Sequence, residues 1–309
     1  MTRPSIDATP VEVGDGVFAY TQPPGGWCVS NAGVIAGRDG AVVVDTLATQ
    51  RRARRLREFV DGLPVGPRRT VVNTHHHGDH TFGNQVFGPA AAIVAHERAA
   101  EEMAETGLAL TSLWPEVEWG DVRVTLPTAT FTDRITLTVG DTRVELIHVG
   151  PAHTTNDVVA WLPESRVLFA GDVVLAGCAP FSLMGSVSGT LAAIERLRGL
   201  DPATVVCGHG PVTGPEVFEE NAAYFRWIQR CAATGVAQGW TPLRTARELG
   251  LGEFAHLLDP ERVVGNLHRA FAEHLDAPAG AAAGAPMDVP PVFGEMVDYN
   301  DGKLPTCLA

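Results

Sequence analysis

The sequence predicts a mixed α/β fold in which two sheets pack together with helices outside them, followed by a helical extension. Two observations lead to this prediction. Short apolar runs between turn residues are followed by a helical segment, and this arrangement occurs twice before residue 215. Beyond residue 215 the apolar residues recur at helical spacing instead. A chain of 309 residues is long enough to bury a large core and still carry such an extension.

The strands of the first set are short runs of apolar or β-branched residues, bounded by glycine, proline or polar residues. They are predicted over residues 11–20, 29–36, 41–45, 70–73 and 93–94. A helix is predicted over 51–61, because Leu56, Phe59 and Val60 share one side of it among arginines. A second helix is predicted from about residue 96 to residue 106.

The second set repeats the pattern and ends near residue 214. Its strands are predicted over residues 135–139, 143–149, 158–162, 166–170 and 204–207, and its helix over 190–200. We therefore place one domain at 1–214 and a helical extension at 215–309, packed on it. The helices of the extension are predicted over 216–233, 242–249 and 260–275. The alanine- and glycine-rich stretch 277–286 predicts a flexible segment, after which residues 289–309 dock back.

Composition excludes several classes of partner. The chain has 36 acidic and 23 basic residues and a formal charge of −13, which argues against nucleic acid. The first ten residues lack the apolar run of a signal peptide, and no stretch approaches the roughly 18 apolar residues of a membrane span. We expect a cytoplasmic protein without a membrane partner. The five cysteines are widely spaced without a CxxC pair, so we expect free, mainly buried thiols.

Seven potential metal ligands occur at four places, each where a predicted strand gives way to a loop. They are His75, His77, Asp79 and His80 in the run THHHGDH, and then His153, Asp172 and His209. In an extended segment side chains alternate, so His75, His77 and Asp79 project to one side and His76 to the other. Gly78 permits the bend that brings His80 to the same side. One loop thus supplies four donors, and a carboxylate such as Asp172 can bridge two ions.

Imidazole and carboxylate donors without thiolate suit zinc, and they also allow iron or manganese. We therefore expect two divalent metal ions, with zinc as the first choice. Two ions with an open coordination position polarise a carbonyl oxygen and lower the pKa of a shared water molecule. The donor set thus indicates a metal-dependent enzyme that attacks an acyl group. Whether Asp79 or a bound hydroxide accepts the proton stays open.

The same residues carry a resemblance to a known family. The run THHHGDH, Asp45 at the end of an earlier strand, PAHT, FAGD and CGHG resemble the ordered motifs of the metallo-β-lactamase superfamily. The resemblance covers about residues 10–215 and implies a four-layer αββα sandwich with the metals at one edge of the sheets. It implies that Asp45 orients the histidine loop. It also implies a first metal held by His75, His77 and His153, a second held by Asp79, His80 and His209, and Asp172 as the bridge.

A finer resemblance extends through nearly the whole chain. The segments PPGGWCVSNAG, TFGNQVF, GLALTSLWP and YNDGKLPTCLA are similar to the second-ring cyclases of bacterial aromatic polyketide pathways, of the actinorhodin type. This resemblance implies a cyclase of antibiotic biosynthesis with thioesterase activity. Its substrate would be a poly-β-ketone held as a thioester on an acyl carrier protein. Aldol condensation would close the second ring, and thioester hydrolysis would release the bicyclic product. His76 departs from the pattern, which has an aromatic residue there.

Two other functions stay open. A general thioester or lactone hydrolase of the same fold would use the same ligands. A metal-stabilised module that binds a carrier protein without turnover belongs to a different class. A true β-lactamase is disfavoured, because the chain has aspartate rather than cysteine at the bridging position and lacks an export signal. The oligomeric state, including a homo-oligomer, is also left open.

Several aromatic and flexible apolar residues in predicted loops are candidates for a substrate-binding cleft. They are Trp27, Phe82, Trp114, Phe181 and Met184. An acidic carrier protein would need a local basic patch, and the arginines of the helix 51–61 offer one. They are Arg51, Arg52, Arg54, Arg55 and Arg57.

Overall fold

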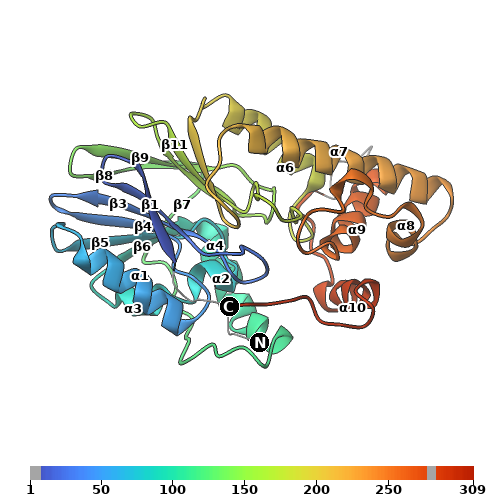
Figure 1. Ribbon diagram of the computed structural model, residues 1–309, viewed down its shortest axis with the longest axis horizontal. Coiled ribbons are helices and arrows are strands. Elements are labelled where there is room, and N and C mark those ends of the chain that lie inside the picture. The colour runs from blue at the N-terminus through green and yellow to red at the C-terminus, as the bar shows by residue number, and fades with distance from the viewer. Residues whose placement is uncertain (1–7, 277–282) are drawn as a thin grey trace.

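Two sheets lie face to face and form the centre of the fold (Figure 1). The computed structural model describes residues 8–276 and 283–309. The seven-stranded sheet has the order β1-β2-β3-β4-β5-β6-β7, and its strands are Thr9–Gly14, Val17–Thr21, Ala32–Gly37, Gly40–Val44, Arg68–Val72, Ala92–His96 and Ala129–Phe131. The five-stranded sheet has the order β12-β11-β10-β9-β8, and β8 to β12 are Arg134–Val139, Thr142–His148, Val158–Leu162, Val167–Gly171 and Thr204–Cys207.

The direction of the strands changes within the first sheet, and this change positions the histidine loop. Strands β1 to β4 pair antiparallel, whereas β4, β5, β6 and β7 pair parallel. Helix α1 (Gln50–Gly62) connects β4 to β5, as a parallel pair requires a crossover. The parallel strands β4 and β5 therefore end at the same edge, so Asp45 and the run that begins at Thr74 emerge side by side.

Side chains that alternate along β4 face two different layers. Val42 and Val44 point into the core between the sheets, whereas Val43 points toward Leu56 and Val60 of α1. Burying a side chain such as Leu56 contributes about 1.5–3 kcal/mol. Helices α6 (Val187–Arg198) and α7 (Glu216–Ala237) cover the outer face of the second sheet in the same way. The layers are thus helix, sheet, sheet and helix, which confirms the predicted αββα sandwich.

The helices after β12 share a core of their own (Figure 1). Besides α7 they are α8 (Pro242–Leu249), α9 (Arg262–Leu275) and α10 (Val289–Tyr299). Helix α8 begins in the way its sequence favours, because Pro242 occupies the first turn and the Thr241 side chain accepts a hydrogen bond from the amide of Arg244. Part of α7 packs on the second sheet, which joins this core to the sandwich. The division at residues 214 and 215 stays a prediction.

The last residues return to the sandwich. Trp114 Nε1 donates a hydrogen bond to Pro305 O at 2.7 Å, and Cys307 forms a β-bridge with Trp27. Arg52 Nη2 donates to Leu308 O at 2.7 Å, and its Nη1 donates to Gln22 Oε1 at the same distance. The prediction that Arg52 belongs to a surface patch was therefore wrong, because this side chain is buried and anchors the chain's final segment.

Several predicted elements differ from the structure. The single strand predicted over 11–20 is a hairpin of β1 and β2, with a turn at Asp15 and Gly16, where Gly16 has a φ of 66°. Five short elements were not predicted, because they are too short to show a period: α2 (Gly78–Thr81), α3 (Asn84–Phe87), α5 (Ala109–Leu113), the 3₁₀-helix η1 (Gly252–Phe254) and β7. The final segment was predicted only to dock, and its first part is the helix α10.

Three further predictions concern cysteines, membranes and the flexible stretch. All five cysteines are free, and four of them are buried, as expected. Within residues 8–276 and 283–309, no helix is both long enough and apolar enough to cross a bilayer. Residues 277–282 of the stretch predicted to be flexible lie outside the described part of the chain.

Candidate metal centre

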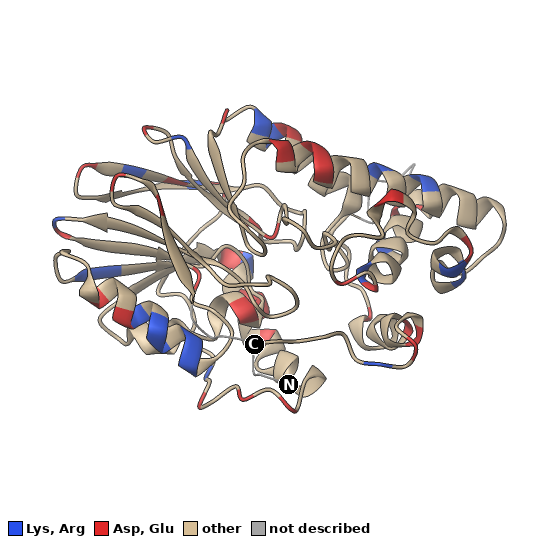
Figure 2. Cartoon of the chain, in the orientation of Figure 1, with Lys and Arg blue, Asp and Glu red and all other residues tan. Residues whose placement is uncertain are grey.

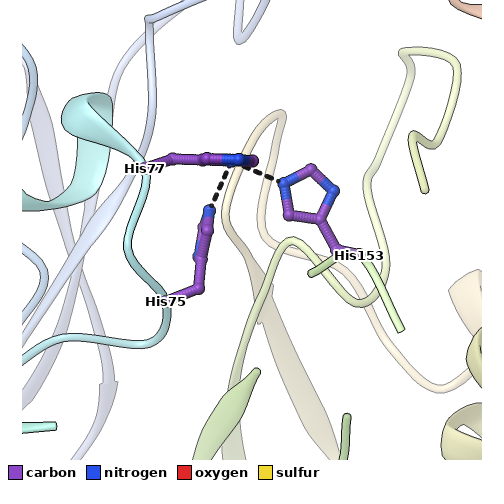
Figure 3. Close-up of side chains that lie close together, drawn as sticks. All are labelled: His75, His77 and His153. Atoms are coloured by element: carbon purple, nitrogen blue, oxygen red, sulfur yellow. Dashed lines mark hydrogen bonds between the residues drawn. The ribbon is translucent and has the colours of Figure 1, made fainter. Parts of the chain in front are cut away.

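Three histidines from two loops meet at the edge of the sheets (Figure 3). His75 and His77 follow β5, and His153 lies between β9 and β10. The Nδ1 atom of His77 lies 3.1 Å from His75 Nε2 and 2.9 Å from His153 Nε2. Ligands about 2.0–2.1 Å from a tetrahedral zinc ion are about 3.3 Å apart. Both distances are thus already close to the spacing that one metal ion imposes, and all three nitrogens lie within 4.8 Å of one another.

A second group lies beside the first. Asp79 and His80 come from the short helix α2, and His209 follows β12. Asp79 Oδ2 lies 3.5 Å from His80 Nε2 and 3.3 Å from His209 Nε2. Gly78, just before Asp79, packs so closely on the Phe82 ring that a Cβ atom there would lie 2.3 Å from it. Glycine is required at this bend because of that contact.

Asp172 stands between the two groups. Its Oδ2 atom lies 3.5 Å from His153 Nε2 and 3.3 Å from His209 Nε2, and its Oδ1 atom lies 3.3 Å from His80 Nε2. A Cβ atom at residue 208 would lie 1.8 Å from Asp172 Oδ1, so the glycine before His209 leaves the space that this carboxylate occupies. One carboxylate therefore contacts donors of both groups, which is the arrangement of a bridging ligand.

In four of the histidines, the ring nitrogen that faces away from the centre is held by another group. His75 Nδ1 lies 3.0 Å from Thr74 Oγ1, and His80 Nδ1 lies 2.8 Å from Asp45 Oδ2. His153 Nδ1 donates to Phe181 O at 2.5 Å, and His209 Nδ1 donates to Gly26 O at 3.1 Å. A carbonyl oxygen only accepts, so these contacts fix the proton on Nδ1 and direct the Nε2 lone pair at the centre.

Three polar atoms of the centre are buried without a hydrogen-bond partner: His77 Nε2, His80 Nε2 and Asp172 Oδ1. Buried polar groups in folded proteins nearly always have a partner, because an unsatisfied one costs free energy. His80 Nε2 and Asp172 Oδ1 both face the other donors. The unsatisfied atoms and the donor spacing fit a dinuclear site for divalent metal.

The two groups differ in protonation. Burial holds the pKa of His75 and of His77 well below its usual value, and it lowers the pKa of His153 to about 4. Burial also acts on His209, but Asp172 and Asp79 outweigh it and raise its pKa to about 9. The pKa of His80 is raised well above its usual value, because Asp172, Asp79 and Asp45 likewise outweigh burial. Without metal, the histidines of the first group are neutral at neutral pH, whereas His80 and His209 of the second group are protonated.

Asp45 supports the histidine loop as the resemblance implied. Its Oδ1 accepts a hydrogen bond from the Thr74 amide at 2.8 Å, and its Oδ2 accepts from Thr74 Oγ1 at 2.7 Å. Oδ2 also lies 2.8 Å from His80 Nδ1. Its backbone has a φ of 61°, a conformation that aspartate and asparagine tolerate better than most residues. The carboxylate thus links the start of the loop to one of its last donors.

His76 faces the opposite side of the loop, as the alternation predicted. Its Nδ1 atom lies 3.3 Å from Glu102 Oε2 and 3.1 Å from Asn156 Nδ2.

Sequence reasoning missed the residue that holds the His153 loop. Asp157 Oδ2 accepts hydrogen bonds from the amides of Ala152 and Thr154, and burial raises its pKa to about 7. The aspartate four residues after His153 could have been recognised as a candidate for such a turn.

A cavity of about 70 Å³ opens beside the donors. Besides metal-site residues it is lined by Trp27, Cys28, Leu110, Phe181 and Arg262. Of the predicted substrate contacts, Trp27 and Phe181 therefore lie on its wall. Phe82 and Trp114 are buried in the hydrophobic cluster behind that wall, and Met184 packs on the helical core. Arg262 was not predicted, because nothing in the sequence distinguishes it from the other arginines of the predicted helix.

The sandwich and the clustered donors define a protein with a site that fits divalent metal. The family model described as "Metallo-beta-lactamase superfamily" matches residues 25–209, which is more than half of the chain, and the chain belongs to this superfamily. Two solved structures share the fold. A metallo-beta-lactamase family protein from Thermus thermophilus has 21% identity and a TM-score of 0.65, covering 86% of this chain and 95% of its own. A sec-alkylsulfatase from Pseudomonas sp. has 17% identity and a TM-score of 0.67, covering 94% and 54%.

Similar curated proteins differ in their activities. The 2,4-dinitroanisole O-demethylase subunit alpha of Nocardioides sp. is 27% identical over 77% of this chain and 67% of its own. The linear primary-alkylsulfatase of Pseudomonas sp. is 25% identical, over 60% and 43%. The hydroxyacylglutathione hydrolase of Rhodospirillum rubrum is 30% identical, over 45% and 47%. The match thus spans less than half the length of the last two. Together with the superfamily match, these relatives support a hydrolytic enzyme.

Proposed function

We propose that this protein is a metal-dependent cyclase with thioesterase activity that acts on a carrier-bound poly-β-ketone of aromatic polyketide biosynthesis. One observation carries the finer part of the proposal. The four sequence segments that resemble second-ring cyclases meet in one hydrophobic cluster behind the cavity wall. They contribute Cys28, Phe82, Trp114 and Cys307. Because these four segments lie around the cavity, the resemblance includes the part of the molecule where a substrate would bind.

In this proposal His75, His77 and His153 hold one metal ion, Asp79, His80 and His209 hold the other, and Asp172 bridges them. Zinc is the first choice, since the donors are imidazole and carboxylate. Two bound ions supply Lewis acidity and lower the pKa of water, which serves both the aldol step and the hydrolysis of a thioester.

The chain's own residues position the substrate. Trp27 and Phe181 lie on the cavity wall with their ring centroids 5.5 Å apart. Aromatic walls suit a flat, partly cyclised chain and keep water away from it. Asp79 is buried, and His80 and His209 outweigh that burial and lower its pKa. A low pKa makes Asp79 a weak proton acceptor.

A general thioester or lactone hydrolase is the second candidate. The observation that favours it is the 30% identity to hydroxyacylglutathione hydrolase, which covers 45% of this chain. It would use the same donors and would differ only in the acyl chain that the cavity accepts.

The products separate the two candidates. A thioester mimic of a first-ring-closed octaketide is supplied to metal-replete and metal-stripped enzyme, and the products are identified by mass spectrometry. We expect a bicyclic, released product that depends on metal. Release of the uncyclised acid, with no more cyclised product than forms in buffer alone, would contradict the cyclase and favour the hydrolase.

Metal affinity should depend on pH differently at the two groups. A metal ion that binds His80 and His209 must displace protons, because the pKa of His209 is raised to about 9 and that of His80 is also raised. Affinity there should rise steeply between about pH 6.5 and 8.5, below the raised pKa of His209. The group of His75, His77 and His153 is already neutral, so its affinity should change little. Competition titrations with a chromophoric chelator at several pH values measure both, and equal slopes would contradict this assignment.

We also propose that an acidic carrier protein docks on α1. Arg51, Arg54 and Arg55 are exposed on this helix, where basic residues gather (Figure 2). The buried Arg52 between them contacts Leu308 O, next to the segment that pairs with Trp27 on the cavity wall. The buried side of this helix is therefore linked to the cavity wall through the final segment.

Replacing Arg51, Arg54 and Arg55 together with glutamate should raise KM for a carrier-bound substrate by about tenfold, since rim charges act mainly on association. Turnover of a small thioester mimic, which needs no docking, is the internal control. Steady-state kinetics measures both. Equal changes with the two substrates would show that the charges act on the site and not on docking.

A further inference from the structure

Arg262 is a buried arginine on the wall of the metal-site cavity. It is the first residue of α9 and is 3% exposed. The cavity that it lines also contains His77, Asp79, His153, Asp172 and His209. A positive charge therefore lies beside the donors, on the same wall as Trp27.

The guanidinium is only partly engaged. Its Nη1 donates to Ala179 O at 2.9 Å, and its Nη2 lies 3.1 Å from Asp259 Oδ2. Its Nε is buried and has no hydrogen-bond partner. The Cys178 side chain is a further hydrogen-bond partner. A guanidinium has five N–H groups in a rigid plane, so one carbonyl, one carboxylate and one thiol leave donors for a further oxygen. Arg262 lines the cavity, so an oxygen of a ligand there can accept a hydrogen bond from the donors that these contacts leave.

Neighbouring residues hold the guanidinium in place and keep it charged. Its Cζ atom lies 4.3 Å from the centroid of the Trp27 ring, and Trp27 Nε1 donates to Glu261 Oε1 at 2.6 Å. Burial alone lowers the pKa of Arg262, but Asp259 and other nearby acids outweigh it and raise that pKa. The side chain is thus a fixed cation, stacked on an aromatic residue of the cavity.

We propose that Arg262 binds a second oxygen of a β-ketoacyl substrate, a keto or enolate oxygen of the chain whose thioester carbonyl lies at the metal donors. The inference rests on the proposed function and names the residue that selects oxygen-rich acyl chains. A planar cation with free donors favours an oxygen that carries negative charge, as in an enolate. A saturated acyl chain has no oxygen there and leaves the buried donor unpaired, so it is discriminated against.

Two thioesters that differ in one oxygen test the proposal: the 3-oxooctanoyl and octanoyl thioesters of N-acetylcysteamine. The wild-type enzyme should have a higher kcat/KM for the 3-oxo substrate. Arg262→Met should lower the ratio of the two kcat/KM values by about 10- to 100-fold, the effect of losing a hydrogen bond to a charged group. Arg262→Lys keeps the charge but not the planar set of donors, so its ratio should lie between those of the wild type and Arg262→Met. An unchanged ratio in both variants would overturn the proposal.

A matched control comes from the same helix. Arg269 is also buried in α9, where it donates to Leu183 O and Ala285 O and does not line the cavity. Arg269→Met should lower the melting temperature and leave the ratio unchanged. If Arg269→Met changed the ratio as much as Arg262→Met, the effect would be one of packing, and the proposal would fail. Should Arg262→Met not fold, Arg262→Gln and Arg262→Lys give the ratio.

Binding separates this proposal from the proposed function. Calorimetry compares 3-oxooctanamide and octanamide on metal-free protein, where no thioester is cleaved. A preference for the 3-oxo amide that falls about tenfold or more in Arg262→Met supports the role of Arg262, even if the metal-loaded enzyme cleaves neither thioester and the proposed function fails. Equal binding of the two amides by the wild type would overturn the role of Arg262, even if both thioesters are cleaved.

Discussion

Replacing Asp172 with asparagine is expected to lower metal-dependent thioester hydrolysis by about a thousandfold or more. The carboxylate contacts His153, His209 and His80 at 3.3–3.5 Å, so it reaches donors of both groups. Asparagine has the same shape but lacks the charge and one acceptor, so it cannot hold two cations together. Loss of a metal ion removes several kcal/mol of charge stabilisation, and each 1.36 kcal/mol is a factor of ten in rate. Steady-state kinetics and metal analysis of the purified variant measure both effects.

The matched control for this prediction is Asp201→Asn. Asp201 pairs with Arg166 on the surface, at a side-chain exposure of 85%. A surface ion pair contributes little to stability, so this variant should retain its activity and its metal content. If Asp172→Asn kept two metal ions per chain and the wild-type rate, Asp172 would not be the bridge. Unchanged activity after removal of all metal would instead support a binding module without turnover.

Replacing Asp45 with asparagine is expected to weaken metal binding at Asp79, His80 and His209 by about 10- to 100-fold, the usual effect of losing a group that orients a ligand. Asp45 accepts hydrogen bonds from Thr74 and contacts His80 Nδ1 at 2.8 Å, so it fixes the ring that presents Nε2 to the metal. Asparagine tolerates the backbone φ of 61°, which keeps the fold intact. Competition titration with a chelator reports the affinity, and thermal unfolding reports stability.

Asp157→Asn is the reciprocal control. Asp157 holds the loop of His153, whereas Asp45 contacts His80 directly and His75 only through Thr74. Asp157→Asn should therefore weaken the first group more, and Asp45→Asn the second. The Asp45 prediction fails if both groups lose affinity equally, because that result would indicate general destabilisation of the edge of the sheets.

The candidate ligands could be predicted because they are local in sequence or tied to strand ends. Four of them lie within six residues, and alternation alone separated His75 and His77 from His76. Asp172 and His209 each follow a strand of the second sheet closely, where the end of a strand predicts the position of a side chain. The layers could also be predicted, because the spacing of apolar residues along the chain distinguishes strands from helices.

The rest depends on contacts between distant segments, which no local pattern reveals. Arg262 reaches the cavity only because α9 packs beside the loop of Trp27. Trp27 bonds to Glu261, which lies 234 positions later in the chain. Arg52 has the sequence environment of a surface arginine, but its side chain is buried and donates to Leu308 O in the final segment. The hairpin of β1 and β2 could have been predicted, because Asp15 and Gly16 are a recognised turn pair.

The return of the final segment to the sandwich has a consequence for synthesis of the protein. Trp114 bonds to a carbonyl 191 positions later in the chain, and Cys307 pairs with Trp27 on the cavity wall. While the ribosome is still translating, the metal donors up to His209 are already available, but this wall lacks its last contacts. The donors can therefore assemble before the final segment adds its contacts to this wall.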